Sequence, residues 1–251
     1  MSDDIRKIED LSLNAWPSWQ MQFYDGWILR YSAFYTHRTN CVEQLGFSCI
    51  PVEEKVACCE EIYRHWQTPC IFKISPIGDP FVDGYLENRG YHIEHHTTVM
   101  TRSLDDFTEA ALTGHADLRV ENRVSADWIN TLFDLKRESS PLFRKIVPSM
   151  YAAIPMDEVA VTAVLDGKNV GTGLGILDRD TIGIYAIHVA EDARRKGIAS
   201  DIVSTILAEG KKRGAQHAYL QVVTDNAPAV ALYRRLGLRR DYCYWFRVKE
   251  V

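Results

Sequence analysis

A short basic turn, Arg194-Arg195-Lys196-Gly197, carries the residue types best suited to chemistry in this chain. An apolar run at residues 182–189 predicts a strand before the turn, and a helical apolar period at residues 198–213 predicts a helix after it. The first N–H groups of a helix lack intrahelical partners and lie at the positive end of its dipole. Because glycine also lets a ligand approach the backbone closely, the sequence predicts a phosphate-binding site at this turn.

The turn differs from the two best-known glycine-rich phosphate loops. It has neither the Gly-Lys-Ser/Thr ending of the P-loop nor the G-x-G-x-x-G spacing of dinucleotide-binding folds. Its spacing, Arg194-x-x-Gly197-x-Ala199, resembles the R/Q-x-x-G-x-G/A signature of the GNAT acyltransferases. Further along, Asn226 is followed seven residues later by Tyr233 on a helical segment that ends at a glycine, which resembles a second conserved region of that family. The resemblance covers residues 117–251.

The resemblance implies a fold, a co-substrate and a set of site residues. The fold is α/β (α+β), with a mixed, mostly antiparallel sheet flanked by helices. The co-substrate is acetyl-CoA, with no metal, and an amine attacks the thioester directly. The residues implied to bind acetyl-CoA are Ile187 and Val189 on the open edge of a strand, Arg194, Arg195, Lys196, Gly197, Ile198, Ala199 and Ser200 around the pyrophosphate, and Asn226.

Two proton transfers accompany such a reaction. Tyr233 matches the tyrosine that protonates the departing thiolate in the family, and a phenol with a pKa near 10 is protonated at pH 7. Many relatives place a carboxylate early on the strand before the turn, but Thr181 stands at that position. The general base stays open among Asp178, Asp180 and Glu138.

An internal repeat organises the chain. Helix, glycine and strand patterns around Gly90 recur around Gly237, which is an offset of 147 residues (237 − 90). The first copy lacks the basic turn, since residues 46–54 offer Glu53 and Glu54 instead of cations. We therefore expect two GNAT-like domains in tandem: a degenerate, non-catalytic one at residues 1–104, a linker at 105–116, and a catalytic one at 117–251.

Composition and charge restrict the class of protein. Residues 1–116 hold nine Lys/Arg and seventeen Asp/Glu (net −8), and residues 117–251 hold twenty and seventeen (net +3). The more basic half is the one with the predicted phosphate site, as a polyanionic ligand favours. A pI near 5.9 and the lack of a basic stripe argue against nucleic acid. No apolar run is long enough for a membrane span, and the acidic N-terminus is unlike a signal peptide, so we expect a cytoplasmic protein.

Two further patterns suggest sites but have simpler explanations. Three histidines at positions 92, 95 and 96 lie on a predicted strand, where alternation points His95 away from the other two, and no carboxylate or cysteine completes a set, so we expect no metal site. The glycines at 171, 173 and 175 lie within a strand pattern, which indicates a bulge or a close contact.

These features favour an N-acetyltransferase that uses acetyl-CoA and an amine acceptor, either a small molecule or a peptide. A homodimer is compatible with the sequence. The alternative is a non-catalytic acyl-CoA-binding module with a regulatory or interaction role. Tyr233 and Asn226 favour the enzyme, whereas the missing strand carboxylate favours the module.

Overall fold

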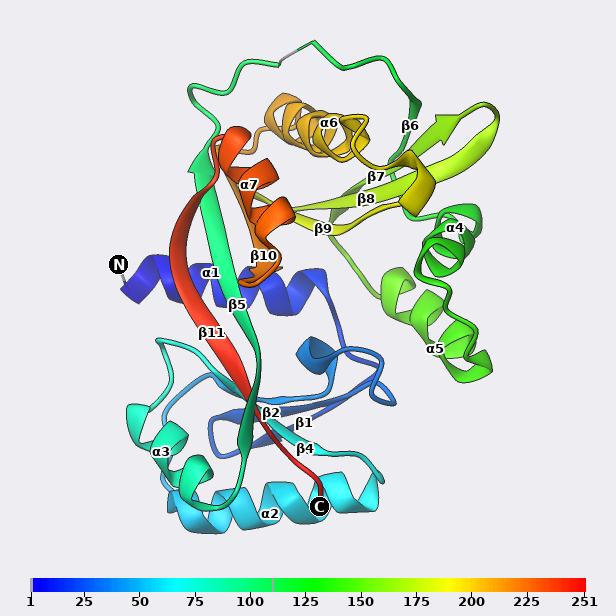
Figure 1. Cartoon of the computed structure of the whole chain (residues 1–251). Helices are drawn as coiled ribbons and strands as arrows, with labels where there is room; N and C mark the ends of the chain where they lie inside the picture. The colour runs from blue at the N-terminus through cyan, green and yellow to red at the C-terminus, as the bar shows by residue number, and fades with distance from the viewer. Residues whose placement is uncertain (1, 110) are drawn as a thin grey trace. The chain divides into compact units, whose positions relative to one another are not determined.

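The structure is a computed structural model that describes residues 2–109 and 111–251 (Figure 1). Its helices are α1 (Ser2–Ala15), α2 (Val52–His65), α3 (Pro80–Asn88), α4 (Ala126–Lys136), α5 (Pro141–Ala152), α6 (Ile198–Lys212) and α7 (Ala227–Arg235), with short 3₁₀ turns η1 (His37–Thr39) and η2 (Glu191–Ala193). Its strands are β1 (Gln20–Tyr24), β2 (Trp27–Tyr31), β3 (Val42–Gln44), β4 (Cys70–Ile74), β5 (His92–Ser103), β6 (Asp117–Glu121), β7 (Asp157–Leu165), β8 (Lys168–Asp178), β9 (Thr181–Val189), β10 (His217–Val223) and β11 (Arg239–Lys249).

The chain forms two compact units. Unit 1 comprises residues 1–98, 223–225 and 242–251, and unit 2 comprises residues 99–222 and 226–241. This division differs from the domains expected from the sequence, residues 1–104 and 117–251, because the end of the last strand, β11, belongs to unit 1. The expected linker at 105–116 lies within unit 2, where Lys211 of α6 donates hydrogen bonds to the carbonyls of Asp105 and Phe107 at 3.1 and 2.9 Å.

In unit 1 the strand order is β1-β2-β3-β4-β11-β5. β1 and β2 form a hairpin around Asp25-Gly26, whose positive φ angles of 44° and 76° suit a tight hairpin turn. The helices α2 and α3 carry apolar residues that pack with the strands into one core, including Val56, Tyr63 and Phe72.

In unit 2 the strand order is β11-β5-β10-β9-β8-β7-β6. β7, β8 and β9 form an antiparallel meander. The helix α6 packs closely on β8: a Cβ on Gly173 would lie 2.3 Å from Ile202 Cγ2, and one on Gly175 would lie 2.7 Å from Ile206 Cγ2. The glycine stripe therefore reflects close packing of a helix on the strand and is no ligand loop.

The structure confirms the internal repeat. β4, α3 and β5 begin at residues 70, 80 and 92, and β10, α7 and β11 begin 147 residues later at 217, 227 and 239. Both helices end in the same way, with Gly90 at φ 84° and Gly237 at φ 85°. The next N–H reaches back to a helix carbonyl in each, from Tyr91 to Leu86 at 3.1 Å and from Leu238 to Tyr233 at 3.0 Å.

The last strands of the two repeats are exchanged. β5 follows α3 along the chain but lies next to β10, and β11 follows α7 but lies next to β4. Residues of β5 and the segment after it, Met100 and Leu104, are buried in the core of unit 2. Each unit is thus completed by a strand that begins in the other repeat.

None of the helices in the described residues is long and apolar enough to cross a membrane.

Candidate active site

The predicted phosphate site lies in unit 2, where β9 leads through η2 into α6. β9 pairs in parallel with β10, with a register from Thr181–His217 to Ile184–Leu220. β9 continues for five residues beyond Ile184, and these are half-exposed whereas the first four are buried. In the described part of the chain, the edge of residues 185–189 that faces away from β8 has no paired strand. The two strands therefore separate and leave an open backbone edge.

A bulge in β9 marks the point of separation. Ala186 has a φ of 49°, and the pairing with β8 shifts register between Thr172 and Leu174, so that two residues of β9 oppose one of β8. The buried Thr172 hydroxyl donates to the Ala186 carbonyl at 3.0 Å. A left-handed conformation costs a non-glycine residue free energy and persists where the surroundings enforce it. The bulge turns the end of β9 away from β10.

Beneath this opening, two tyrosines join the strands. The hydroxyls of Tyr185 on β9 and Tyr219 on β10 hydrogen-bond each other, and their rings meet edge to face at 6.0 Å. Gly183 makes room for both rings, because a Cβ there would lie 2.7 Å from Tyr185 and 2.8 Å from Tyr219. This pair links β9 and β10 where the two strands begin to separate.

The basic turn has the geometry of an anion site. Gly197 is the N-cap of α6 with a φ of 80°, and Arg195 has a φ of 64°. Within residues 2–109 and 111–251, no protein acceptor takes the N–H groups of residues 195–200. Unpaired N–H groups at a helix start, next to residues with left-handed backbone, are of the kind that binds phosphate oxygens.

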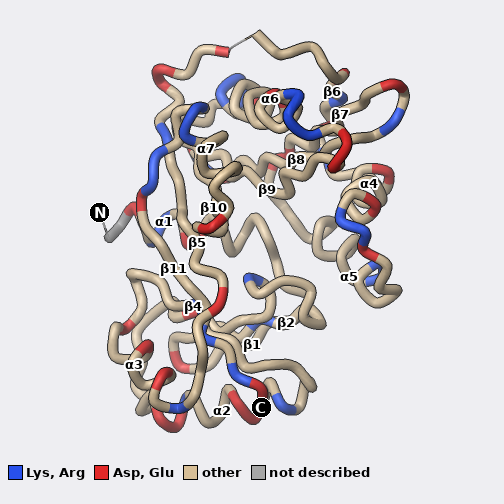
Figure 2. Tube along the Cα trace, in the orientation of Figure 1, with Lys and Arg blue, Asp and Glu red and all other residues tan. Residues whose placement is uncertain are grey.

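The side chains around the turn divide into two kinds. Arg194, Arg195 and Lys196 are exposed, and Figure 2 shows the basic run at the start of α6. The Arg194 Nε donates to the Val189 carbonyl at 3.2 Å, which ties the turn to the end of β9. Ile198 is only 1% exposed, so only its N–H could face a ligand. Ala199 and Ser200 are half-exposed in the first turn of α6.

A loop residue lies against the same turn. Thr113 donates from its N–H to the Asp201 carboxylate at 3.1 Å, and its hydroxyl lies 3.4 Å from the Lys196 carbonyl. A Cβ on Gly197 would lie 2.6 Å from the Thr113 methyl group. Close packing and a positive φ thus both require glycine at position 197.

Tyr233 lies on α7 in the apolar core of unit 2. It is 8% exposed, and burial raises the pKa of its phenol to about 12. Among the described residues, none hydrogen-bonds its hydroxyl. The phenol is therefore protonated at neutral pH and has an unused donor.

Asn226 caps the helix α7. The sequence pattern alone does not distinguish this structural role from ligand binding. Asn226 is the N-cap of α7, and its side-chain oxygen accepts the Ala229 N–H at 3.3 Å. An N-cap of this kind satisfies one of the free N–H groups of the helix. Asn226 is exposed, so its amide nitrogen remains available to a ligand.

The three carboxylates considered as bases lie in different places. Asp178 and Asp180 lie at the start of β9, where β9 is paired with β10, and Asp180 accepts the Thr181 hydroxyl at 2.8 Å. From Thr181 to Val189 the strand advances eight residues, about 26 Å at 3.3 Å per residue. Glu138 lies between α4 and α5 and accepts the Ser140 N–H at 2.8 Å.

His188 is a polar residue of the open stretch that sequence reasoning missed. It is half-buried on β9 beside the end of α4, where it hydrogen-bonds the Leu135 backbone. Burial is the main cause that lowers its pKa, and the nearby cations Lys136 and Arg194 lower it further. The imidazole is therefore neutral at pH 7. Its position in an otherwise apolar strand pattern does not distinguish it from a structural histidine.

In unit 1, the turn before α2 stands where unit 2 has the basic turn before α6. A side chain of unit 1 itself binds the N–H groups of this turn. The Asp25 carboxylate accepts the N–H groups of Cys49 and Ile50 at 2.8 and 2.7 Å and the Ser48 hydroxyl at 2.8 Å. Residues 49 and 50 directly precede the N-cap of α2, Pro51, as residues 195 and 196 directly precede the N-cap of α6, Gly197. The Ile50 N–H is the largest cause that lowers the Asp25 pKa, to about 2. An internal anion thus occupies the position where unit 2 offers free donors.

The expectation about the histidines in unit 1 also needs correction. His95 has a φ of 51°, so strand alternation does not hold there. A carboxylate, Glu94, and a further histidine, His37, lie beside it. The pattern of residues 92–96 gave no sign of His37, which lies more than fifty positions earlier in the chain.

Solved structures share this architecture. A GCN5-related N-acetyltransferase from Kribbella flavida aligns with a TM-score of 0.74 and 14% identity, over 100% of this chain and 96% of the other. A tandem GNAT protein from the clavulanic acid biosynthesis pathway aligns with a TM-score of 0.65 and 14% identity, over 83% of this chain and 75% of the other. These likenesses show a tandem GNAT fold.

The sequence comparisons show the family. The chain belongs to the acetyltransferase family described as "Probable histone acetyltransferase Rv0428c C-terminal", which matches residues 2–246. A Bacillus subtilis (strain 168) protein named "Uncharacterized N-acetyltransferase YobR" is 26% identical over 263 residues, covering 99% of this chain and all of the relative. The Escherichia coli (strain K12) "[Ribosomal protein bS18]-alanine N-acetyltransferase" is 35% identical over 72 residues, 47% of its length. The chain is a GNAT-type acyltransferase.

Proposed function

We propose that unit 2 transfers an acetyl group from acetyl-CoA to an amine and that unit 1 binds no cofactor. The observation that carries this proposal is the set of free N–H groups at residues 195–200, beside an open strand edge at residues 185–189. A CoA molecule combines a pyrophosphate with an amide-containing arm. The turn suits the first, and the exposed backbone of β9 suits the second.

The exposed cations support the binding of a polyanion. The exposed side chains of Arg195 and Lys196 can contact phosphates. The Arg194 Nε donates to the Val189 carbonyl, and the terminal guanidinium nitrogens of Arg194 remain available to a phosphate. Charge-assisted hydrogen bonds to phosphate are shorter and stronger than neutral ones. The backbone groups of Ile187 and Val189 would hydrogen-bond to the amide-containing arm of CoA. The Val189 N–H is our proposed donor to the thioester oxygen.

Tyr233 is the proposed general acid. A pKa of about 12 exceeds that of an ordinary thiol, near 8.5, so complete proton transfer is favourable only where burial also raises the pKa of the thiol. Donation of a hydrogen bond from the phenol to the departing sulfur carries no such requirement. Either role needs the Tyr233 hydroxyl.

His188 is our proposed general base. Its hydrogen bond to the Leu135 carbonyl makes one ring nitrogen the donor, so the other nitrogen of the neutral ring is a proton acceptor. It lies on the separated part of β9, whereas Asp178 and Asp180 lie at the paired end. A neutral amine must be generated at the site, because an amine with a pKa near 10.4 is mostly protonated at pH 7.

The acceptor is proposed to be a primary amine on a small molecule or a peptide. The name of the Escherichia coli relative refers to N-acetylation of an alanine of a ribosomal protein, and that of a Corynebacterium aurimucosum relative is "Mycothiol acetyltransferase". Both matches are short, so they support the class of acceptor and leave its identity to experiment.

The decisive experiment is a turnover assay of the full chain with acetyl-CoA and a panel of amines, monitored as free thiol released. We expect amine-dependent release that is lost when both Arg194 and Lys196 are replaced by alanine. A double change at the exposed residues Lys145 and Lys168 serves as a charge-matched control. Equal activity of the two double variants would contradict the proposed binding site, and acetyl transfer that required no amine would contradict the proposed acceptor class.

A further inference from the structure

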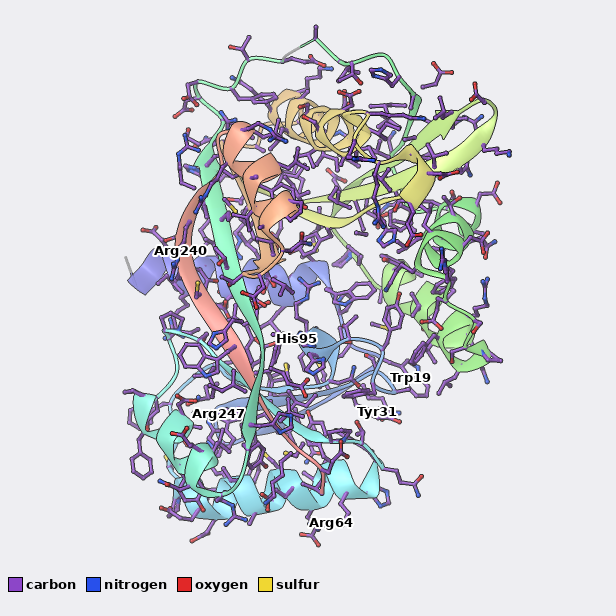
Figure 3. All side chains as sticks on the ribbon, viewed as in Figure 1. Trp19, Tyr31, Arg64, His95, Arg240 and Arg247 are labelled. Atoms are coloured by element: carbon purple, nitrogen blue, oxygen red, sulfur yellow. The ribbon has the colours of Figure 1, made fainter. Side chains whose placement is uncertain are left out.

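A group of potential metal ligands in unit 1 lies outside the acetyltransfer site. One nitrogen each of His37 and His95 and one carboxylate oxygen of Glu94 lie within 4.8 Å of one another. The His37 Nε2 is 2.9 Å from Glu94 Oε2, and the His95 Nε2 is 3.8 Å from the same oxygen. Figure 3 labels His95 on β5. The three ligand atoms are therefore close enough together to contact one ion.

Backbone geometry brings Glu94 and His95 together. Consecutive residues of a regular strand point to opposite faces, but the φ of 51° at His95 breaks this alternation. The Thr97 hydroxyl donates to the His95 carbonyl at 2.9 Å and holds the irregular conformation. A left-handed histidine within a strand is a strained feature that its surroundings maintain.

The loop that carries His37 is fixed by a buried asparagine. Asn40 is fully buried, and its side-chain oxygen accepts the N–H groups of Ser32 and Phe34 at 2.7 and 2.8 Å. Its amide nitrogen donates to the Thr36 carbonyl at 2.6 Å. His37 directly follows Thr36 in the chain and begins η1. A ligand on a loop held this way loses little conformational freedom when it binds an ion.

The surroundings of the group match those of a metal site. The second oxygen of Glu94 lies 2.8 Å from His92 Nε2, so an outer residue orients the carboxylate. The His37 ring packs against the rings of Phe34 and Phe246 at 5.5 and 5.3 Å. Its side chain is 17% exposed, whereas that of His95 is 51% exposed. An ion would thus sit between an apolar wall and solvent.

We propose that His37, Glu94 and His95 bind one Zn²⁺ ion in unit 1, with the fourth position open to water. Two imidazoles and a carboxylate are a ligand set that zinc accepts, at about 2.0–2.2 Å from the metal. In a tetrahedron those lengths place ligand atoms about 3.4 Å apart, between the two distances to Glu94 seen here. Without the ion, the hydrogen bond from His37 to Glu94 holds the group together.

The ion would join η1 to β5 within unit 1. The residues involved take no part in the proposed acetyltransfer site, so the zinc proposal and the proposed function can fail independently. The expected consequence of binding is a more stable unit 1, because an ion that binds the folded state shifts the unfolding equilibrium.

The test is a zinc titration of chelator-treated full-length protein by calorimetry. The exposed thiol of Cys49 is a competing ligand, so every protein carries Cys49→Ser. We expect one saturable site and a Tm that rises with zinc. His37→Asn and Glu94→Gln should each abolish that site, and His92→Asn should weaken it by about 10- to 100-fold. Cobalt binding should give visible absorption in the parent protein that is lost in His37→Asn.

The matched control is His96→Asn, on the same strand, whose ring lies 5.7 Å from that of Trp245. It should bind zinc like the parent protein. Each variant is first compared with the parent by circular dichroism without metal, and Glu94→Gln replaces His37→Asn where the latter unfolds. Zinc binding that survives both ligand changes, or that is lost equally in His96→Asn, would overturn the proposal and leave a hydrogen-bonded histidine–glutamate group only.

Discussion

At the scale of single residues, the Tyr233 hydroxyl offers a clean test, because the ring is buried in an apolar core and the hydroxyl has no described partner. Tyr233→Phe should keep the packing and remove only the donor. We expect kcat to fall about 10- to 1000-fold with CoA affinity little changed, as for the loss of a general acid. Steady-state kinetics and CoA calorimetry check this. An unchanged kcat would assign protonation of the thiolate to water.

His188 offers a second test at this scale, through the pH dependence of the rate. Burial lowers its pKa below 6.5, so the imidazole is neutral above that pKa and gains a proton as the pH falls through it. The proposed base is then lost at low pH, and kcat/KM should decline there. We expect His188→Gln to have a lower rate without that decline. Asp180→Asn, at the paired end of β9, is the control. Loss of activity only in the latter would return the base to the carboxylates.

Some site residues could be predicted from sequence and others could not. The spacing of Arg194, Gly197 and Ala199 is local, so it locates a helix start without knowledge of the fold. The bulge at Ala186 and the irregular conformation at His95 place non-glycine residues at positive φ, which packing enforces and local pattern does not encode. His188 lies in an otherwise apolar run and had no distinguishing signal.

At the scale of elements, the starts of α6 and α2 predict how many CoA molecules bind. The turn before α6 has free N–H groups, whereas the Asp25 carboxylate occupies those before α2. Calorimetry should give one site per chain. Gly197→Asp should abolish it, because it adds a side chain and a negative charge at the turn. Gly214→Asp, at φ 96° with open space around it, is the control for strain and charge. Two equivalent sites in the parent protein would contradict this expectation.

Asp25 also predicts a pH-dependent contribution to stability. Its pKa is lowered from 3.8 to about 2 in the folded state. Ionisation therefore stabilises the fold above about pH 3.8, and the contribution is lost as pH falls through 2. Asp25→Asn should lower Tm at pH 7, and the difference in Tm from the parent should shrink between pH 4 and pH 2. Thermal melts across this range check it, and a constant difference would mean that the carboxylate charge is irrelevant.

The sequence predicts that the first repeat lacks a cofactor site because acids stand where cations are needed, and the structure adds a second physical reason for that prediction. Glu53 and Glu54 do lie in the first turn of α2. The group that takes the free N–H groups is Asp25, more than twenty residues earlier in the β1–β2 hairpin. A contact of this kind depends on how the hairpin folds onto the helix, and periodicity carries no information about it.

At the scale of the whole molecule, the exchange of β5 and β11 predicts which fragments fold. Residues 117–251 contain the entire family signature but lack β5 and with it Met100 and Leu104 of the unit 2 core. We expect this fragment to be poorly soluble or inactive. A fragment of residues 99–241 restores those side chains and should bind CoA more tightly. Solubility, circular dichroism and calorimetry distinguish the two. A monomeric, stable and fully active 117–251 fragment would contradict the expectation.

Strand order was the part of the fold that sequence could not supply. The repeat was visible because helix, glycine and strand patterns recur at one offset. Pairing between β4 and β11, whose paired residues are about 170 or more positions apart, is set by tertiary packing. The same patterns would fit a chain with two independent domains.

The exchange also bears on the order in which a ribosome can complete the protein. Unit 1 needs residues 242–251, which lie between β4 and β5 in its sheet. Since the end of β4, Ile74, and the last β11 residue paired with β4, Lys249, are 175 positions apart (249 − 74), synthesis at about 5–20 residues per second leaves the nascent β4 edge uncovered for about 9–35 s. Unit 1 is therefore completed after unit 2, and loss of residues 242–251 would expose that edge permanently.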